Sequence, residues 1–194
     1  FPNKQLAFEA PLSVYDAARE AELISREVIA CSVDGKMVDL THVIDGDAAV
    51  VLYTFEDKEG AHVFRHTASH VLAQAVKRLF PEAKLTIGPA IDDGFYYDFD
   101  SEVTFTAEVL EKLEGEMKKI IKENAKLERF TLPRDEAVAF MTERNEPYKV
   151  QLIEELPEGE EISFYRMGDF VDLCAGPHLF TTGAIKAFKL TQCT

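Results

Sequence analysis

Hydrophobic residues recur at helical spacing around a pair of histidines in the first half of the chain. The apolar positions are Ala68, Val71, Leu72, Ala75, Val76 and Leu79, and Pro81 is expected to end the helix. His66 and His70 lie within this segment, four positions apart. Because residues i and i+4 share one face of a helix, the pattern predicts that both imidazoles point into one site.

Residues 1–57 show the pattern of a small mixed α/β unit. Strands are expected at Gln5–Glu9, 28–33 and 48–53, the last of them buried. Ser13 is expected to cap a short helix, and Asp34-Gly35 predicts a tight hairpin. A strand, a helix and a hairpin in this order suggest a ubiquitin-like β-grasp domain.

Residues 62–194 are expected to form a larger mixed α/β domain, so that the whole chain is of the α+β class. The polar segment Glu56–Gly60 is the expected boundary. Further strands are predicted at 85–91, 94–99, 162–167, 170–173 and 187–190, and further helices at 106–127 and from Pro133. In the strand at 94–99, Phe95, Tyr97 and Phe99 share one face, and core packing is favoured there over stacking on a base.

Composition limits the function classes. The net charge is −14, with 35 acidic and 21 basic residues, which argues against a general coat for nucleic acid. The lysines at 118–126 interleave with glutamates, so a solvated helix face is favoured there. No apolar run is long enough to span a bilayer, and three cysteines fit reduced thiols, so we expect a cytoplasmic protein without a membrane partner. The absence of an initiator Met and of a polar tail suggests part of a longer protein.

A second pair of reactive side chains, Cys174 and His178, is also four positions apart, with Gly176-Pro177 forcing a bend between them. Together with His66 and His70 they predict one composite site. Three chemistries fit it: a zinc ion, favoured by spacing alone; a metal-free pocket with imidazole bases; or Cys174 as a covalent nucleophile. Asp172 would orient a histidine, accept a substrate amine or make local backbone contacts.

These segments resemble the amino-terminal part of bacterial-type threonyl-tRNA synthetases. The similar pieces are His66-Thr-Ala-Ser-His70, Ile87-Gly88-Pro89, Gly94-Phe95-Tyr96-Tyr97-Asp98 and Asp172-Leu173-Cys174-Ala175-Gly176-Pro177-His178. The β-grasp ahead of them resembles the TGS module of that family. The paired His and Cys motifs alone are shared with alanyl-tRNA synthetases and their free-standing relatives.

The resemblance implies an editing domain that hydrolyses seryl-tRNA(Thr) made in error. A serine differs from threonine by one methyl group, worth roughly 1–3 kcal/mol in a binding pocket, which is too little for faithful translation. By similarity the catalytic set is His66, His70, Cys174, His178 and Lys149, and the substrate-binding set is Tyr97, Asp172 and Gly88. The partner is the 3′ end of mischarged tRNA(Thr) with its seryl-adenosine.

The same resemblance bears on cofactors. The threonyl branch implies a metal-free editing pocket, with His66, His70, Cys174 and His178 as zinc ligands in the alternative. ATP and Zn²⁺ would belong only to a catalytic core outside this chain, in a parent synthetase that dimerises through other domains. Two alternatives stay open: a zinc-dependent deacylase of another mischarged tRNA, of the alanyl type, and a non-catalytic tRNA-binding module with structural zinc.

Overall fold

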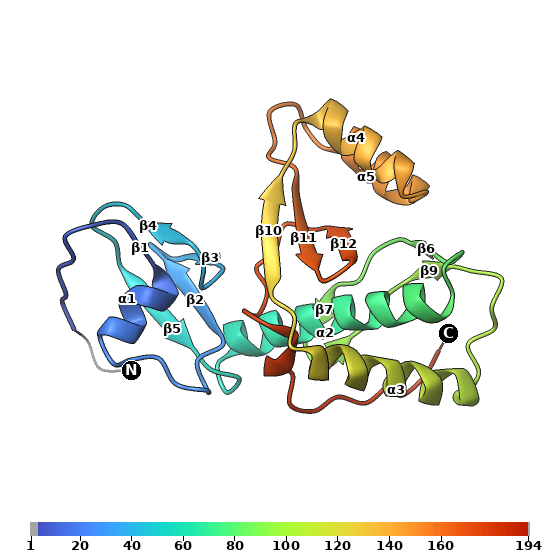
Figure 1. Cartoon of the computed structure of the whole chain (residues 1–194), viewed down its shortest axis with the longest axis horizontal. Helices are drawn as coiled ribbons and strands as arrows, with labels where there is room; N and C mark the ends of the chain where they lie inside the picture. Colours follow the sequence, from blue (N-terminus) through green and yellow to red (C-terminus); the bar gives the residue numbers. More distant parts are fainter. Residues whose placement is uncertain (1–3, 194) are drawn as a thin grey trace. The chain divides into compact units, whose positions relative to one another are not determined.

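The computed structural model describes residues 4–193 and contains five α-helices with several small antiparallel sheets in that range (Figure 1). Contacts divide the chain into two units. The first is Phe1–Phe64 with Gly176–Phe180, and the second is Arg65–Ala175 with Thr181–Thr194. Phe1 and Thr194, the ends of the predicted domains, lie outside the described residues.

In the first unit, a three-stranded antiparallel sheet has the order β3-β2-β5, formed by Lys36–Val38, Ala30–Val33 and Val50–Tyr53. The predicted hairpin is confirmed, because Asp34 and Gly35 both have positive φ, at 50° and 79°, as the favoured two-residue turn requires. Ser13 caps helix α1 (Val14–Glu20): its hydroxyl accepts the Asp16 N–H at 3.0 Å. Short strands β1 (Leu12–Ser13) and β4 (Val43–Ile44) form a separate pair.

Two predictions for this unit are wrong. Gln5–Glu9 is not a strand; Leu6 and Phe8 are 47% and 41% exposed, and the alternation there has no partner strand to pair with. In β5 only Leu52 is buried, whereas Val50 and Val51 are exposed. The β-grasp topology itself stays a prediction.

Helix α2 runs from Lys58 to Leu79, so the expected polar boundary at Glu56–Gly60 is partly helical. Gly60 is required for packing rather than for a flexible link. A Cβ at this position would lie 1.9 Å from the carbonyl oxygen of Thr54.

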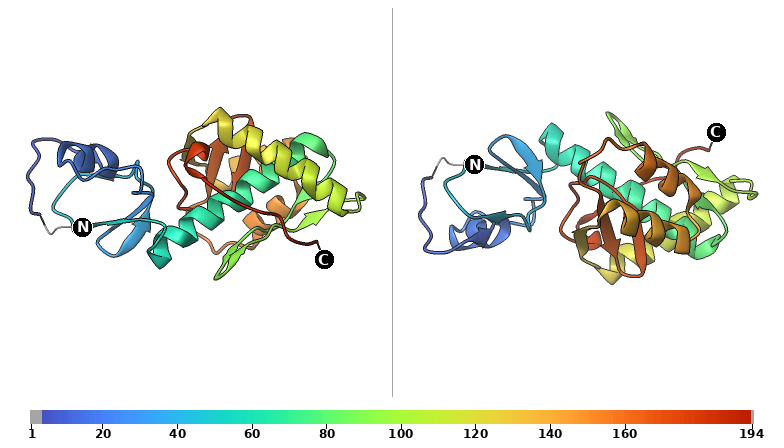
Figure 2. Two further views of the ribbon diagram at one scale, coloured as in Figure 1. Left: turned by 90° about the horizontal axis from the view of Figure 1, so that it is seen from below. Right: turned by 90° about the horizontal axis from the view of Figure 1, so that it is seen from above.

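In the second unit, α2 and α3 (Ala107–Glu123) lie side by side, as Figures 1 and 2 show. Arg78 of α2 joins them through its ion pair with Glu123 at 2.7 Å. A three-stranded antiparallel sheet has the order β10-β11-β12, formed by Leu127–Thr131, Ser163–Met167 and Phe170–Leu173. Helices α4 (Arg134–Glu143) and α5 (Pro147–Glu155) pack on this sheet through Met141, Ile153 and Phe164.

The aromatic strand is shorter than predicted. Two pairs of two-residue strands form instead: β6 (Lys84–Leu85) with β9 (Phe99–Asp100), and β7 (Ala90–Ile91) with β8 (Gly94–Phe95). The alternation of faces is confirmed, since Tyr97 is 8% exposed and Tyr96 is 42% exposed. Tyr97 also stacks on Phe99, with ring centroids 4.8 Å apart, as expected for core packing.

Three further differences concern which residues form helices and strands. Residues 187–190 form no strand, and α3 ends four residues early, because Asn124 takes a left-handed conformation with φ 51°. Helix α5 was not predicted. The last regular element in the described range is the short 3-10 turn η1 (Thr182–Ala184). Within the described residues, none of the helices has the length and apolar character needed to cross a membrane.

Candidate functional site

The two histidines of α2 share one face, as their spacing predicts. Their ring centroids are 5.1 Å apart, with the planes at 77°. His70 is buried, and burial lowers its pKa well below 6.5; the charges of His66 and Lys149 lower it further. His70 is therefore a neutral imidazole at neutral pH.

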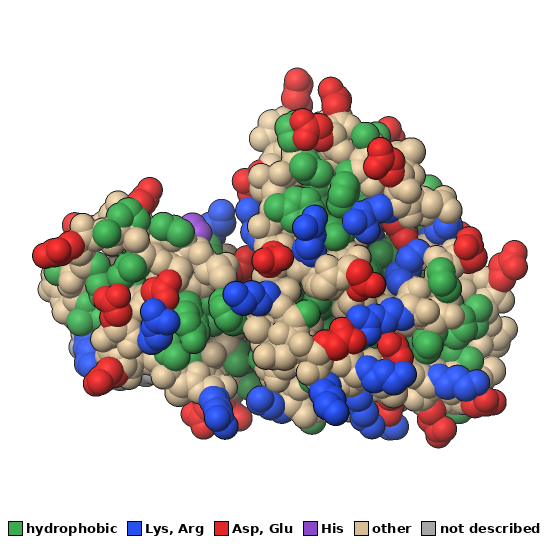
Figure 3. Space-filling model, viewed as in Figure 1, with side chains coloured by type: hydrophobic (Ala, Val, Ile, Leu, Met, Phe, Trp, Pro, Cys, Tyr) green, Lys and Arg blue, Asp and Glu red, His purple; other side chains and the backbone are tan. Residues whose placement is uncertain are grey.

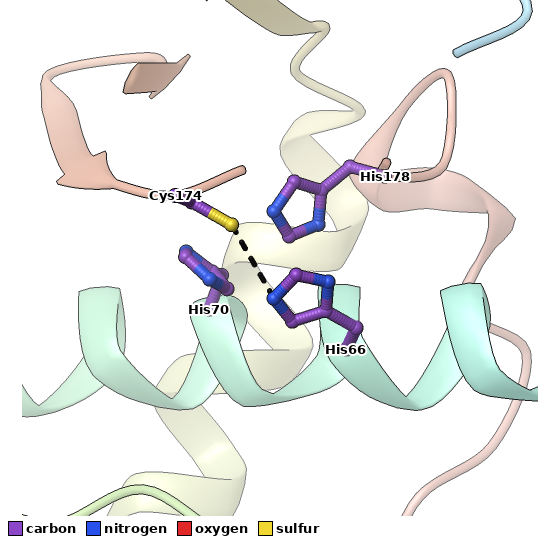
Figure 4. A group of neighbouring side chains, drawn as sticks. All are labelled: His66, His70, Cys174 and His178. Atoms are coloured by element: carbon purple, nitrogen blue, oxygen red, sulfur yellow. Dashed lines mark hydrogen bonds between the residues drawn. The ribbon is translucent and has the colours of Figure 1, made fainter. Parts of the chain in front are cut away.

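Cys174 follows the last residue of β12 and meets the first histidine. Its Sγ lies 3.3 Å from Nε2 of His66, although 108 positions separate the two residues (Figure 4). Ser163 of β11 holds the cysteine from both sides. The Cys174 N–H donates to the Ser163 carbonyl at 3.0 Å, and the Ser163 hydroxyl donates to the Cys174 carbonyl at 2.6 Å. The thiol is thus fixed beyond the end of the sheet.

The four predicted His and Cys side chains offer ligand atoms within 4.8 Å of one another: His66, His70, Cys174 and His178 (Figure 4). Imidazole and thiolate are the ligands that Zn²⁺ takes in proteins. With usual bond lengths, ligand atoms around tetrahedral zinc lie about 3.4–3.7 Å apart. The donor set therefore suits zinc chemically, and it would contract to hold the ion.

Asp172, in β12, is the centre of a buried polar network. Its side chain is 1% exposed. Oδ2 accepts the Tyr97 hydroxyl at 2.6 Å and lies 3.4 Å from Nδ1 of His70, and Oδ1 lies 2.8 Å from the ammonium of Lys149. Burial and the Asp172 charge raise the pKa of Tyr97 well above 10, so its hydroxyl keeps the proton that it donates.

The ion pair leaves one acceptor position of Asp172 open. Oδ1 lies 2.8 Å from the Lys149 ammonium, and no other donor among the described residues is recorded as reaching it. The same ammonium lies 5.5 Å from the centre of the Tyr97 ring. The carboxylate is thus neutralised but retains a lone pair that a donor from a bound molecule could use.

Gly88 lies against the ring of Tyr97. A Cβ at this position would be 2.0 Å from Cδ2 of that ring, so only glycine allows the ring to lie where it does. The Ser69 hydroxyl fixes the glycine by donating to its carbonyl at 2.6 Å. This geometry makes Gly88 a support for Tyr97, and its assignment to substrate binding stays a prediction.

Two features that position Lys149 were not predicted from sequence. One is helix α5, which carries this lysine in its first turn. The other is Glu146, whose backbone carbonyl accepts the Lys149 N–H at 3.1 Å, and whose buried carboxylate accepts the Leu85 N–H at 2.8 Å and pairs with Lys77 at 2.8 Å. Asn145, with φ 56°, and Pro147 at the first helical position are the local signals that would have located this helix.

One segment of the chain matches a known family of tRNA synthetase domains. Residues 162–194 match the family described as "Threonyl and Alanyl tRNA synthetase second additional domain". This range contains Asp172, Cys174 and His178 but not the first histidine pair, and it includes none of residues 1–57. The identification of residues 1–57 as a TGS module therefore remains a prediction.

More particularly, the chain is homologous to threonine–tRNA ligases. It is 59% identical over 189 residues to that of Clostridium kluyveri, covering 97% of this chain and 30% of the relative. Identity to the Acetivibrio thermocellus ligase is 64% over 167 residues, 86% of this chain and 26% of the relative. For the Caldanaerobacter subterraneus ligase it is 58% over 184 residues, 94% and 29% respectively. The chain thus spans about 30% of the length of the relatives it matches.

Proposed function

We propose that residues 62–194 hydrolyse seryl-tRNA(Thr) by attack of a water molecule on the aminoacyl ester. The observation that carries the proposal is the buried Asp172 network beside the His66–Cys174 contact. It places a base, a thiol, an ammonium and a carboxylate within one group of side chains. Homology to threonine–tRNA ligases supports tRNA(Thr) as the partner.

His66, alone or with Lys149, deprotonates the attacking water. A neutral imidazole suits base catalysis near neutral pH. The Cys174 thiol, 3.3 Å from Nε2 of His66, orients this ring rather than attacking the ester itself. His70 and His178 complete the surroundings in which the water is placed.

Asp172 and Tyr97 hold the serine moiety. The open lone pair on Oδ1 of Asp172 suits the α-ammonium of an aminoacyl ester, which is a charged hydrogen-bond donor. Gly88 supports Tyr97, which in turn fixes Oδ2 of the carboxylate. Threonine is excluded because its extra methyl group clashes with the pocket. A difference in affinity alone would separate the two amino acids by only about 1–3 kcal/mol.

We propose that the site works without metal, because the Lys149 ammonium already places a positive charge against the Asp172–His70 pair. The alternative is favoured by the donor set itself: His66, His70, Cys174 and His178 would hold Zn²⁺, which would polarise the ester carbonyl. Elemental analysis and chelation decide between them, since stoichiometric zinc with activity lost on chelation would establish the alternative.

The decisive experiment compares hydrolysis of seryl-tRNA(Thr) and threonyl-tRNA(Thr) by this chain and by its His66→Ala variant. We expect the unchanged chain to hydrolyse the seryl ester selectively. The His66→Ala variant should hydrolyse it at a much lower rate. His62→Ala is the matched control, because His62 is exposed one turn earlier on the same helix. A full rate of hydrolysis in His66→Ala would remove this residue from the mechanism. Equal hydrolysis of alanyl-tRNA would favour the alternative deacylase of the alanyl type.

Cys174 separates water attack from covalent catalysis. With water as the nucleophile, Cys174→Ser keeps part of the activity and no acyl-enzyme accumulates. A seryl thioester on Cys174, detected by mass spectrometry, would establish the covalent route instead.

For the whole protein, we propose attachment of threonine to tRNA(Thr) with ATP, in a homodimer that forms through parts outside this chain. Residues 1–57 would be its TGS-like β-grasp module. Aminoacylation assays of the full-length ligase test this separation of attachment and hydrolysis. In the His66→Ala variant, mischarged seryl-tRNA(Thr) should accumulate.

A further inference from the structure

The first unit includes a short segment from the far end of the chain. Gly176–Phe180 belongs to this unit, whereas the residues on either side, Ala175 and Thr181, belong to the second unit. His178 lies in the middle of the segment and supplies one of the four ligand atoms that lie within 4.8 Å of one another (Figure 4). One side chain of the candidate site therefore folds with the first unit.

Asp39 holds the backbone at this histidine. It follows strand β3, and its Oδ1 accepts the His178 N–H at 2.9 Å, although 139 positions separate the two residues. A hydrogen bond to a carboxylate is stronger than one to a neutral acceptor. Because His178 is buried, loss of this acceptor would leave its N–H unsatisfied, which is costly.

Phe180 attaches the same segment by packing. Its ring stacks on that of Tyr15 in α1, with the centroids 5.0 Å apart and the planes at 7°. Both rings pack against the core of the first unit, which consists of Val14, Ala18, Val28, Cys31, Leu40 and Leu52. The segment is thus attached at its centre by a hydrogen bond and at its end by an aromatic contact.

The second unit fixes the chain before and after this segment. Ser163 holds Cys174 through two hydrogen bonds, and Thr181 forms a β-bridge with Lys126. The residues between Cys174 and Thr181 form neither helix nor strand, so no backbone ladder sets the position of His178. The contacts within the first unit are what set it.

We propose that the first unit holds His178 in the hydrolytic site, with Asp39 as a positioning residue and the Tyr15–Phe180 stack as a second attachment. The inference rests on the proposed function, because it concerns the same site. Asp39 acts through the backbone of His178 and not on the ester itself, so that the imidazole keeps its place beside the attacking water.

The test measures two properties of this 194-residue chain: hydrogen exchange of the His178 amide by NMR, and kcat and KM for seryl-tRNA(Thr). Asp39→Ala removes the acceptor. The amide should then exchange about tenfold faster, and kcat should fall about tenfold with KM nearly unchanged, since His178 places the water and not the substrate. Asp39→Asn keeps an acceptor oxygen and should restore both values to within about threefold of the unchanged chain.

The matched control is Asp47→Ala, which removes an exposed carboxylate from the same unit and should change neither property. Asp and Glu side chains are spread over the visible face of the first unit, where Figure 1 places α1 and strands β1–β5 (Figure 3). Loss of one of them is therefore an ordinary surface change.

A double-mutant cycle separates positioning from general destabilisation. In the His178→Ala background the imidazole is absent, so Asp39→Ala should lower kcat no further. Tyr15→Leu, which removes the stacking partner of Phe180, tests the second attachment without altering Asp39. It should lower kcat severalfold, and again not in the His178→Ala background. Effects that multiply in these double variants would overturn the proposal, as would unchanged His178 exchange in Asp39→Ala.

The two readouts separate this inference from the proposed function. If the unchanged chain does not hydrolyse seryl-tRNA(Thr), the proposed function fails, and faster exchange of the His178 amide in Asp39→Ala would still establish that the first unit holds this residue. If the unchanged chain hydrolyses the ester and Asp39→Ala keeps its full kcat, only the inference fails.

Discussion

Replacing Asp172 by Asn removes one charge from the buried network and leaves its size unchanged. The variant strands the Lys149 ammonium, 3% exposed, without the carboxylate that lies 2.8 Å away. The amide oxygen still accepts a hydrogen bond from Tyr97, so the loss falls mainly on the ion pair.

The magnitude follows from the geometry. Two unit charges 2.8 Å apart attract by about 6 kcal/mol at an effective dielectric constant of 20, before the cost of desolvating them. Removing one partner of a buried pair costs about 3–5 kcal/mol, because the other charge stays buried. We therefore expect Asp172→Asn to lower the free energy of unfolding of the second unit by about 3–5 kcal/mol and to abolish hydrolysis.

Urea unfolding followed by circular dichroism measures the loss. The control is Asp169→Asn, the same substitution at a side chain that is 81% exposed, which should change stability by no more than about 0.5 kcal/mol. The double variant Asp172→Asn/Lys149→Met removes both charges and should recover most of the stability without recovering activity. Equal effects of the two Asp→Asn changes would refute the reasoning that Asp172 and Lys149 form a strongly coupled buried pair.

Three other predictions concern single residues. Because burial holds the pKa of His70 well below 6.5, the unfolded chain binds this proton first as the pH falls. The fold should therefore lose stability from this group as the pH falls below 6.5. In His70→Gln the pH-dependent loss of stability in urea unfolding should be smaller, and an unchanged loss would contradict the prediction. Gly88→Ala should cost about 1–3 kcal/mol and slow seryl-ester hydrolysis, because its Cβ overlaps the Tyr97 ring, whereas Gly94→Ala, where a Cβ meets nothing, should do neither. Burial raises the pKa of Cys31 to about 12, so a thiol reagent at pH 8 should modify it only after unfolding; modification in the folded chain at the rate of the exposed Cys193 would disprove this.

Local patterns predicted many elements, and the failures have physical causes. The Ser13 cap, the Asp34-Gly35 hairpin and the α2 histidine face depend on neighbours within four residues, so the sequence suffices for them. Gln5–Glu9 alternates as a strand does, but a strand also needs a partner, which no local pattern supplies. The interrupted aromatic segment shows the same limit, since it depends on distant packing, whereas Asn145 and Pro147 are local signals for α5 that went unused.

The candidate site also combines features that the local sequence predicts with contacts that only the fold creates. The sequence by itself determined that His66 and His70 share a face and that Cys174 and Asp172 lie at the end of a strand, because helical and strand periods are local properties of the backbone. Only the tertiary structure decided that Cys174 meets His66 across 108 positions, and that Lys149 and Tyr97 reach the same carboxylate. Such contacts depend on how helices pack on a sheet, which is set by the shape of the whole core and by burial that no single segment encodes.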